Sequence, residues 1–268
     1  MNPVHSSAAS RDFSLRLPDA DEPLEQDEEW AHLDRNGTPG RIRFHDYDEI
    51  YSIPGLYEHI FYDVLECDSP RTVRHLFEAE LKQDGFNPQD LRVLDVGAGN
   101  GMVSEQLADM GASSLVGVDI IPEAKMAAER DRPGLYDDYL VADLTALTPD
   151  QEQRIVDQRL NTMCCVAALG FGDIPPRAFA HAVNLISDRG WVSFNIKVDF
   201  FDDSDPTGFN LLIRSLFDDG TFKTLCKERY RHRLSVRGEP LDYVAFVAEK
   251  TAPISEEAIV AAEADNDP

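Results

Sequence analysis

Short apolar runs alternate with amphipathic helical patterns through the middle of this sequence. Five runs predict buried strands, at residues 92–96, 115–119, 139–142, 162–167 and 191–196. Helical patterns begin near Gly101, Pro122, Pro149 and Pro175, and a fifth follows Pro206. This alternation is typical of an α/β domain whose mostly parallel sheet carries helices on both faces.

The last part of the chain breaks this alternation. Residues 229–235 and 243–250 are both extended, and the Arg-Gly-Glu-Pro sequence at 237–240 between them is a hairpin signal. In the first of these strands Arg229, Arg231 and Arg233 occupy alternate positions. A charged alternate face is typical of an edge strand, and substrate binding by these arginines is the alternative.

The flanking segments divide the chain into four predicted parts. Residues 1–40 are acidic with few large apolar residues, which predicts a flexible arm. Residues 41–90 are rich in aromatics and end in a helix with Pro70 in its first turn and a stop at Gly85, which predicts a helical cap. Residues 91–250 form the main domain, and residues 251–268 an acidic tail.

Composition limits the classes of function. The 268 residues, 43% of them hydrophobic, suffice for one substantial core. The formal net charge of -25 repels phosphate backbones and anionic lipids, so no nucleic-acid or membrane partner is expected. No apolar stretch is long enough to span a bilayer or to form a secretory signal. The cysteines form no C-x-x-C pair, which favours a reducing, cytoplasmic compartment over a zinc site.

A glycine loop carries the strongest chemical signal. Residues 93–101 read Val-Leu-Asp-Val-Gly-Ala-Gly-Asn-Gly, so a buried strand runs into three alternate glycines and then a helix. Bare backbone lets a ligand lie against such a loop, and N–H groups at the helix start face the ligand. The third glycine comes one residue earlier than in the G-x-G-x-x-G pattern of NAD enzymes. The carboxylate of Asp95 suits a ligand with an ammonium group better than one with a pyrophosphate.

With this loop, the sequence resembles the class I S-adenosylmethionine-dependent methyltransferases over residues 91–250. The resemblance implies a Rossmann-like, seven-stranded, mostly parallel sheet with an antiparallel last strand. It also implies S-adenosyl-L-methionine as cofactor and S-adenosyl-L-homocysteine as product. Asp119 would bind both ribose hydroxyls, with Ile120 packed on the adenine. Asp143 would accept a hydrogen bond from the adenine amino group, beside the backbone of Leu144.

The resemblance extends to the end of the fourth strand, where the backbone at Ala167 would lie near the methionine part of the cofactor. For the acidic residues at strand ends, the alternative role is a cap on the following helix. Tyr51 resembles part of the lid of small-molecule members, and packing against the sheet is its alternative role. The predicted cofactor-binding residues are Asp95, Gly97, Ala98, Gly99, Asn100, Gly101, Asp119, Ile120, Asp143, Leu144, Ala167 and Tyr51.

The sequence leaves the methyl acceptor open. It lacks the Asn- or Asp-Pro-Pro-aromatic motif of methyltransferases that act on nucleobase or glutamine nitrogens. Phe171, Asp173 and the loop 199–203 are candidate pocket residues, and no metal is expected. The candidates for a general base are His45, His59, His181 and His232, and none is assigned as catalytic. We expect transfer to an O, N or C atom of a small molecule, by a monomer or homodimer.

Three other functions stay open at this stage. A non-catalytic protein could use the same site to sense S-adenosylmethionine. An NAD-dependent dehydrogenase is disfavoured by the early third glycine, by Asp95 and by the closing hairpin. An aminopropyltransferase would suit an acidic pocket, but no motif indicates one.

Overall fold

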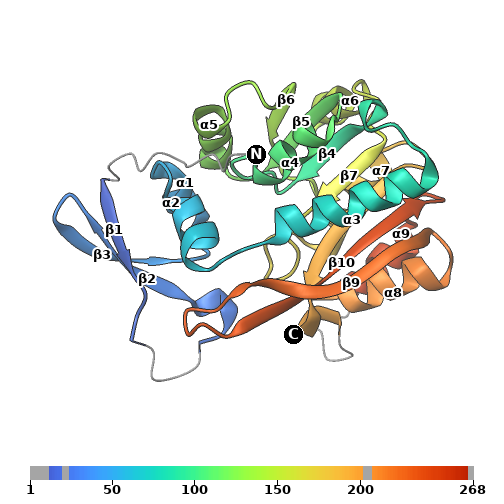
Figure 1. Cartoon of the computed structure of the whole chain (residues 1–268). Helices are drawn as coiled ribbons and strands as arrows, with labels where there is room; N and C mark the ends of the chain where they lie inside the picture. The colour runs from blue at the N-terminus through green and yellow to red at the C-terminus, as the bar shows by residue number, and fades with distance from the viewer. Residues whose placement is uncertain (1–11, 20–23, 202–206, 265–268) are drawn as a thin grey trace.

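A seven-stranded sheet forms the centre of this computed structural model (Figure 1). The structure describes residues 12–19, 24–201 and 207–264. From edge to edge the strands are β6 (Asp138–Val141), β5 (Ser114–Asp119), β4 (Arg92–Val96), β7 (Thr162–Cys165), β8 (Trp191–Lys197), β10 (Pro240–Lys250) and β9 (Phe222–Leu234). Neighbours from β6 to β8 pair in parallel, and β10 runs antiparallel to both of its neighbours. This order confirms the predicted Rossmann-like fold.

Helices cover both faces of the sheet. Alternate residues of β4 point to opposite sides, so that Val93 packs in one core cluster and Leu94 in another. The cluster of Val93 includes α3 (Ser69–Asp84) and α4 (Met102–Met110), while α5 (Pro122–Asp131) contacts β5 and β6. The cluster of Leu94 takes in α6 (Pro149–Val156), α7 (Pro176–Leu185), α8 (Phe209–Asp218) and α9 (Glu256–Ala264).

The helix α3 belongs to this main domain rather than to the cap. Its apolar face, with Val73 and Phe77 at its centre, packs against Val93 and Trp191 of the sheet. A proline in its first turn and Gly85 in the left-handed conformation (φ +75°) mark its two ends. The predicted boundary at residue 90 therefore falls too late, since the helix that precedes β4 already covers the sheet.

A small antiparallel sheet replaces the flexible arm expected at residues 1–40, and that prediction is wrong for the part of the segment that the structure describes. The sheet consists of β1 (Phe13–Arg16), β2 (Trp30–Arg35) and β3 (Thr38–Arg43), with a 3-10 turn, η1 (Gln26–Glu28), before β2. Ala31 and Leu33 of β2 and Ile42 of β3 are buried in one cluster with Ile50 and Leu56. Residues 1–11 and 20–23 lie outside the described residues.

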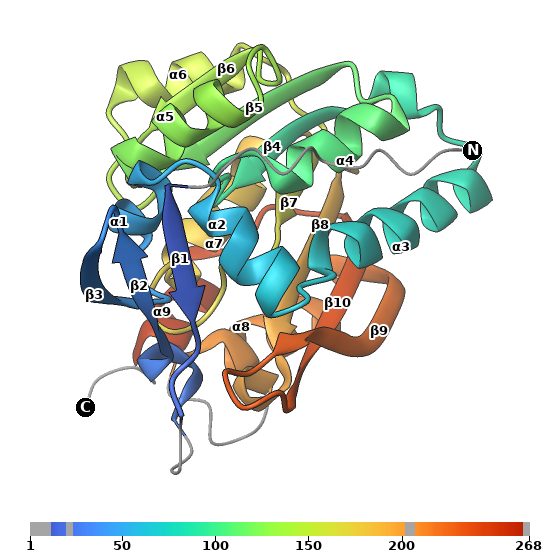
Figure 2. The same cartoon turned by 60° about the vertical axis from the view of Figure 1, so that its left-hand side comes forward.

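The cap proper is short and lies between the small sheet and the large one (Figure 2). It consists of α1 (Tyr47–Ser52), α2 (Leu56–Glu58) and a π-helical turn, η2 (His59–Val64). Extensive contacts join α1 to α5. The cap elements therefore occupy residues 47–64 of the segment 41–90 for which a helical cap was predicted.

The acidic tail is also ordered in part. The helix α9 buries Ile259 and Ala262 against α7 and α8, and Arg177 forms ion pairs with Glu256 at 2.9 Å and Glu263 at 2.7 Å. The expected tail is therefore a packed helix over residues 256–264, and residues 265–268 lie outside the described residues. The remaining elements are short 3-10 turns, η3 (Pro88–Asp90) and η4 (Val198–Phe201).

Candidate functional site

The glycine loop follows β4 and needs its glycines for two separate reasons. Gly97 and Gly99 both have positive φ values, +66° and +53°, which side chains rarely adopt. In addition, a β-carbon at Gly97 would lie 2.8 Å from Cβ of Ala168, and one at Gly99 would lie 2.4 Å from the hydroxyl oxygen of Tyr51. The loop is therefore pressed between the end of β7 and the cap.

Asp119, at the carboxyl end of β5, ties the loop to the next strand. Its Oδ2 accepts a hydrogen bond from the backbone N–H of Gly99 at 2.9 Å, and its Oδ1 accepts one from Ile121 at 3.0 Å. Burial raises the pKa of this carboxyl group, and the backbone hydrogen bonds partly offset that rise. Each oxygen has a further lone pair, so the carboxylate can still accept hydrogen bonds from a ligand.

The first cavity at this edge, which we call the loop cavity, is lined by the ends of the parallel strands. Its walls include Gly97, Asp119, Ile120, Asp143, Leu144 and Ala167. The side chain of Ile120 is 60% exposed, which is unusual for a large apolar residue and leaves its surface free for a flat ligand. Asp143 accepts two hydrogen bonds from Thr145 through Oδ1, which lower its pKa and keep it ionised.

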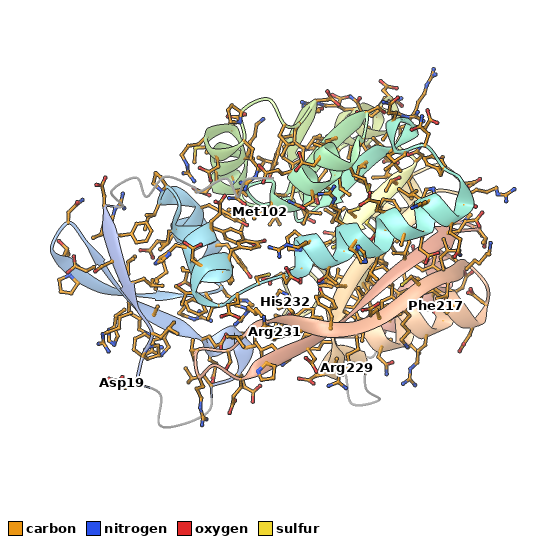
Figure 3. The ribbon with its side chains drawn as sticks, viewed as in Figure 1. Asp19, Met102, Phe217, Arg229, Arg231 and His232 are labelled. Atoms are coloured by element: carbon orange, nitrogen blue, oxygen red, sulfur yellow. The ribbon has the colours of Figure 1, made fainter. Side chains whose placement is uncertain are left out.

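A second cavity, which we call the cap cavity, is lined by tyrosines of the cap that also line the first. Its walls come from η1, the cap, the glycine loop with the start of α4, and the β9–β10 hairpin. Figure 3 labels Met102 at the start of α4 and His232 on β9. Its volume is about 60 Å³, against about 160 Å³ for the loop cavity. The two cavities share one wall, formed by Tyr47, Tyr51, Tyr57, Gly97, Asp173 and residues 166–168.

Asn100 offers an unused acceptor in the cap cavity. Its Nδ2 donates to Glu58 at 3.2 Å and to Asp131 at 3.3 Å. Its Oδ1 is buried and has no hydrogen-bond partner among the residues that the structure describes. A buried acceptor without a partner is costly, so this position favours a ligand that donates a hydrogen bond.

Asp95 does not reach either cavity, and its predicted contact with a ligand ammonium group needs correction. The side chain is 1% exposed and accepts hydrogen bonds from Ser104 of α4 at 2.6 Å and from Tyr136 at 2.9 Å. Asp95 therefore connects the strand before the glycine loop to Ser104 and Tyr136 and does not bind a ligand in either cavity. Burial raises its pKa from 3.8 to about 7, although both hydrogen bonds act in the opposite direction.

The raised pKa of Asp95 predicts that the stability of the folded protein depends on pH. Because the pKa of Asp95 is higher in the folded protein, the folded state binds more protons than the unfolded one between about pH 4 and pH 7, and stability falls as the pH rises through that range. A shift of this size corresponds to about 4 kcal/mol. We expect Asp95→Asn to gain stability relative to the wild type as the pH increases. Urea unfolding of both proteins at pH 5 and pH 8 measures the difference, and a pH-independent difference contradicts the prediction.

The cap is held over the loop by the end of α5. Arg130 donates to the backbone carbonyl of Tyr51 at 2.9 Å, and Arg132 donates to Glu58 at 2.8 Å. Tyr51 also stacks on Tyr57, with 4.8 Å between ring centroids. Burial raises the pKa of Tyr51 well above its ordinary value, so its hydroxyl stays protonated. The sequence left packing and ligand contact open for Tyr51, and the structure shows a side chain that packs while also lining both cavities.

Of the four candidate histidines, two line the cap cavity and two do not. His45 lines the cap cavity, with Nδ1 3.7 Å from Asp173, and His232 lines it with its ring against Tyr243. His232 is buried and bonds Ser69 at 2.6 Å. His59 instead pairs with Asp63 on the cap. His181 is half-buried and bonds the carbonyl of Leu144 at 2.7 Å.

Only some of the other predicted pocket residues line the cap cavity. Phe171 and Asp173 line the cap cavity. In the loop 199–203, Asp199 pairs with Lys197 at 2.8 Å, the ring of Phe200 lies 4.7 Å from that of Phe171, and residues 202 and 203 lie outside the described residues. Sequence reasoning missed Gln26 and Tyr243, which reach the cavity from opposite ends of the chain and carry no local signal.

The three arginines of β9 have two different roles. Arg229 pairs with Asp242 and Arg231 with Glu66, both at the surface of the edge strand (Figure 3), as the edge-strand interpretation predicts. Arg233 is buried and pairs with Glu29 of the small sheet segment at 2.6 Å. A protective edge charge is therefore the wrong interpretation for Arg233.

Comparison with known families decides what this site belongs to. A family profile described as a methyltransferase domain matches residues 68–222, which is more than half of the chain. The chain belongs to this methyltransferase family. It is a class I S-adenosylmethionine-dependent methyltransferase, its cofactor is S-adenosylmethionine, and the predicted resemblance is confirmed.

Two solved structures of other methyltransferases are similar to this chain. The N-methyltransferase NodS from Bradyrhizobium japonicum WM9, in complex with S-adenosyl-L-homocysteine, is 11% identical with a TM-score of 0.54, and the match covers 78% of this chain and 98% of NodS. Magnesium protoporphyrin IX methyltransferase (ChlM) from Synechocystis PCC 6803 is 20% identical with a TM-score of 0.47, and the match covers 68% of this chain and 79% of that one. Comparison with curated proteins gives no match.

Two further findings concern membrane-spanning helices and metal sites. In the described ranges, no helix is both long and apolar enough to cross a membrane. Within those same ranges, no three His, Cys, Asp or Glu side chains come together in a way that could hold a metal ion.

Proposed function

We propose that this methyltransferase transfers the methyl group of S-adenosylmethionine to a small molecule bound in the cap cavity. The observation that carries the proposal is the wall shared by the two cavities, since a cofactor in the loop cavity would present its methyl group through that wall to the cap cavity. The cap cavity has a volume of about 60 Å³, and the formal net charge of -25 disfavours a nucleic-acid acceptor, so we propose a small acceptor.

The residues present fit the cofactor. Asp119 would accept from the ribose hydroxyls through its remaining lone pairs, and the exposed face of Ile120 would pack on the adenine. Asp143 and the backbone of Leu144 would bind the adenine edge. The backbone of Gly97 and Ala167, in the shared wall, would lie along the methionine part. The unpartnered Oδ1 of Asn100 lines the cap cavity, so a ligand bound there would donate a hydrogen bond to it.

The chemistry requires mainly alignment. When bound, the cofactor supplies an activated methyl group on a positively charged sulfur. The protein's task is to hold the acceptor atom in line with that bond and to keep water away, and such positioning accounts for much of the acceleration in transfers of this kind. Tyr47, Tyr51 and Tyr57 close the shared wall and perform both tasks.

Cofactor binding is tested by thermal unfolding. S-adenosyl-L-homocysteine at 100 times its dissociation constant should stabilise the folded protein by about 2.7 kcal/mol, which raises Tm by about 5–10 °C. NAD at the same concentration should leave Tm unchanged, because the loop offers no pyrophosphate site. Incubation with labelled S-adenosylmethionine and a pool of small metabolites then tests the acceptor class, and label found only in protein or nucleic acid would contradict the proposal.

A further inference from the structure

We propose that the acceptor is a small amine and that Asp173 takes the proton from its ammonium form before the methyl group is transferred. This inference rests on the proposed function and narrows its substrate class. It starts from the charges at the point of transfer, the wall shared by the loop cavity and the cap cavity.

The shared wall carries a single formal charge among its described residues. Three of its side chains are tyrosines, residues 166–168 and Gly97 are uncharged, and Asp173 supplies the only carboxylate. An acceptor hydroxyl would have to become negative beside that carboxylate, which is unfavourable at short range. An acceptor amine arrives as a cation and is attracted to it.

Positive side chains that could favour an acidic acceptor are already paired. Arg233, which lines the cap cavity, forms its buried ion pair with Glu29 at 2.6 Å. Lys197 lies near Phe171 but pairs with Asp199 at 2.8 Å. A carboxylate or phenolate acceptor would therefore find no unpaired cation in the described part of the cavity walls.

The tyrosines of the shared wall suit an amine for a second reason. Burial raises the pKa of Tyr47 and of Tyr51 well above the ordinary value, so neither hydroxyl becomes a base near neutral pH. The faces of Tyr51 are covered by Tyr47 and Tyr57, with 6.2 Å and 4.8 Å between ring centroids. These neutral side chains leave Asp173 as the one charged group of the described shared wall, and methyl transfer to an amine places positive charge on the acceptor nitrogen beside it.

Asp173 is placed to accept the proton. It lines both cavities, and Nδ1 of His45 lies 3.7 Å from its Oδ2. Burial raises the pKa of Asp173 to about 6, and the negative charges of Asp119 and Asp27 add to that rise. Burial also lowers the pKa of His45, which keeps its ring neutral, so that no imidazolium charge competes with the acceptor for Asp173.

The far end of the cap cavity recognises an uncharged group. Gln26 donates from Nε2 to the hydroxyl oxygen of Tyr243 at 2.9 Å, which leaves the Tyr243 hydroxyl hydrogen free to donate. Oε1 of Gln26 is buried with no partner among the described residues. A hydroxyl or amide group on the acceptor can bond both atoms, so an amine with a neutral polar group at its other end fits best.

In the proposed step, the ammonium group of the acceptor gives one proton to the Asp173 carboxylate and becomes a neutral amine. Its nitrogen lone pair then forms the bond to the methyl carbon, while the bond from that carbon to sulfur breaks and leaves its electron pair on sulfur. The products are a methylated ammonium ion, S-adenosyl-L-homocysteine and a protonated Asp173, which returns its proton to solvent.

Paired acceptors test the inference on the full-length protein. We would incubate it with labelled S-adenosylmethionine and ethanolamine or 3-aminopropanol, alongside ethylene glycol or 1,3-propanediol as the isosteric alcohols. Calorimetry on the complex with S-adenosyl-L-homocysteine measures the affinity for each compound. We expect at least one amine to be methylated and to bind at least tenfold more tightly than its alcohol.

Two variants connect that preference to the carboxylate. Asp173→Asn should lower amine methylation and amine affinity by 10–100-fold, while S-adenosyl-L-homocysteine, whose sulfur is uncharged, should bind within about threefold of its wild-type affinity. Asp109→Asn removes an exposed carboxylate of α4 that lines neither cavity and should change neither value. Transfer to alcohols but to no amine overturns the inference and leaves the proposed function standing. Binding of S-adenosyl-L-homocysteine without transfer to any of these amines also overturns the inference, whereas the proposed function fails only if the pool of small metabolites takes up no label.

Discussion

Replacing Asp119 by alanine is expected to weaken the binding of S-adenosyl-L-homocysteine by about 100-fold or more. The substitution removes the acceptor proposed for two ribose hydroxyls, and hydrogen bonds to a charged group contribute about 1.5–3 kcal/mol each. It also removes the partner of the Gly99 and Ile121 backbone N–H groups, so the loop loses its link to β5. Calorimetric titration of the folded variant gives the affinity, and circular dichroism confirms the fold.

Two controls separate the ribose contact from general damage to the loop. Asp119→Asn keeps one side-chain oxygen and should lose about tenfold in affinity, because a neutral acceptor forms weaker hydrogen bonds. Asp143→Ala removes an exposed carboxylate from the same cavity and should lose less than Asp119→Ala. An affinity of Asp119→Ala within threefold of the wild type would show that the ribose does not bind at this carboxylate.

The central sheet could be predicted from the sequence because its signals are local. Prolines stand in the first turns of α3, α5, α6 and α7, and apolar periodicity distinguishes the helices from the strands between them. The carboxyl ends of parallel strands meet at one edge. Gly97, Asp119 and Asp143, which follow or end three of these strands, accordingly line one cavity.

The small N-terminal sheet was missed because composition was given more weight than turn chemistry. Asn36 and Gly37 connect β2 to β3 with φ values of +53° and +81°, and an Asn-Gly pair is among the strongest hairpin signals in a sequence. The acidic residues around it concealed that signal. What stabilises the sheet lies far away in sequence, on the cap and on the β9–β10 hairpin, so no local pattern could show it.

The site itself was predictable only where the backbone determines it. The loop glycines follow from the turn, but the direction of the Asp95 side chain depends on Ser104 and Tyr136, which reach it from α4 and from the segment before β6. Likewise the pairing of His45 with Asp173 and the approach of Gln26 to Tyr243 join distant parts of the chain. Residue types at strand ends can be read from a sequence, whereas contacts between such distant side chains require the folded structure.

Removing the buried cation of Arg233 is expected to destabilise the protein by about 3–5 kcal/mol. Arg233 is 2% exposed and Glu29 is 1% exposed, so Arg233→Met leaves a carboxylate buried without its partner. The loss should lower Tm by roughly 10 °C, at about 2–4 °C per kcal/mol for a chain of this size. Arg229→Met, which breaks the exposed pair with Asp242, should cost less than about 1 kcal/mol.

A double variant tests whether the unpaired charge is the cause. Oε1 of Glu29 accepts a hydrogen bond from the backbone N–H of Val236 at 2.7 Å, and a glutamine can keep that bond without a charge. Adding Glu29→Gln to Arg233→Met should therefore recover most of the lost stability in urea unfolding, because a buried ion pair and a neutral replacement often differ little in free energy. If the double variant is as unstable as Arg233→Met alone, the loss comes from the packing of the arginine stem. The small sheet would then be held to the β9–β10 hairpin by apolar contact rather than by the pairing of charges.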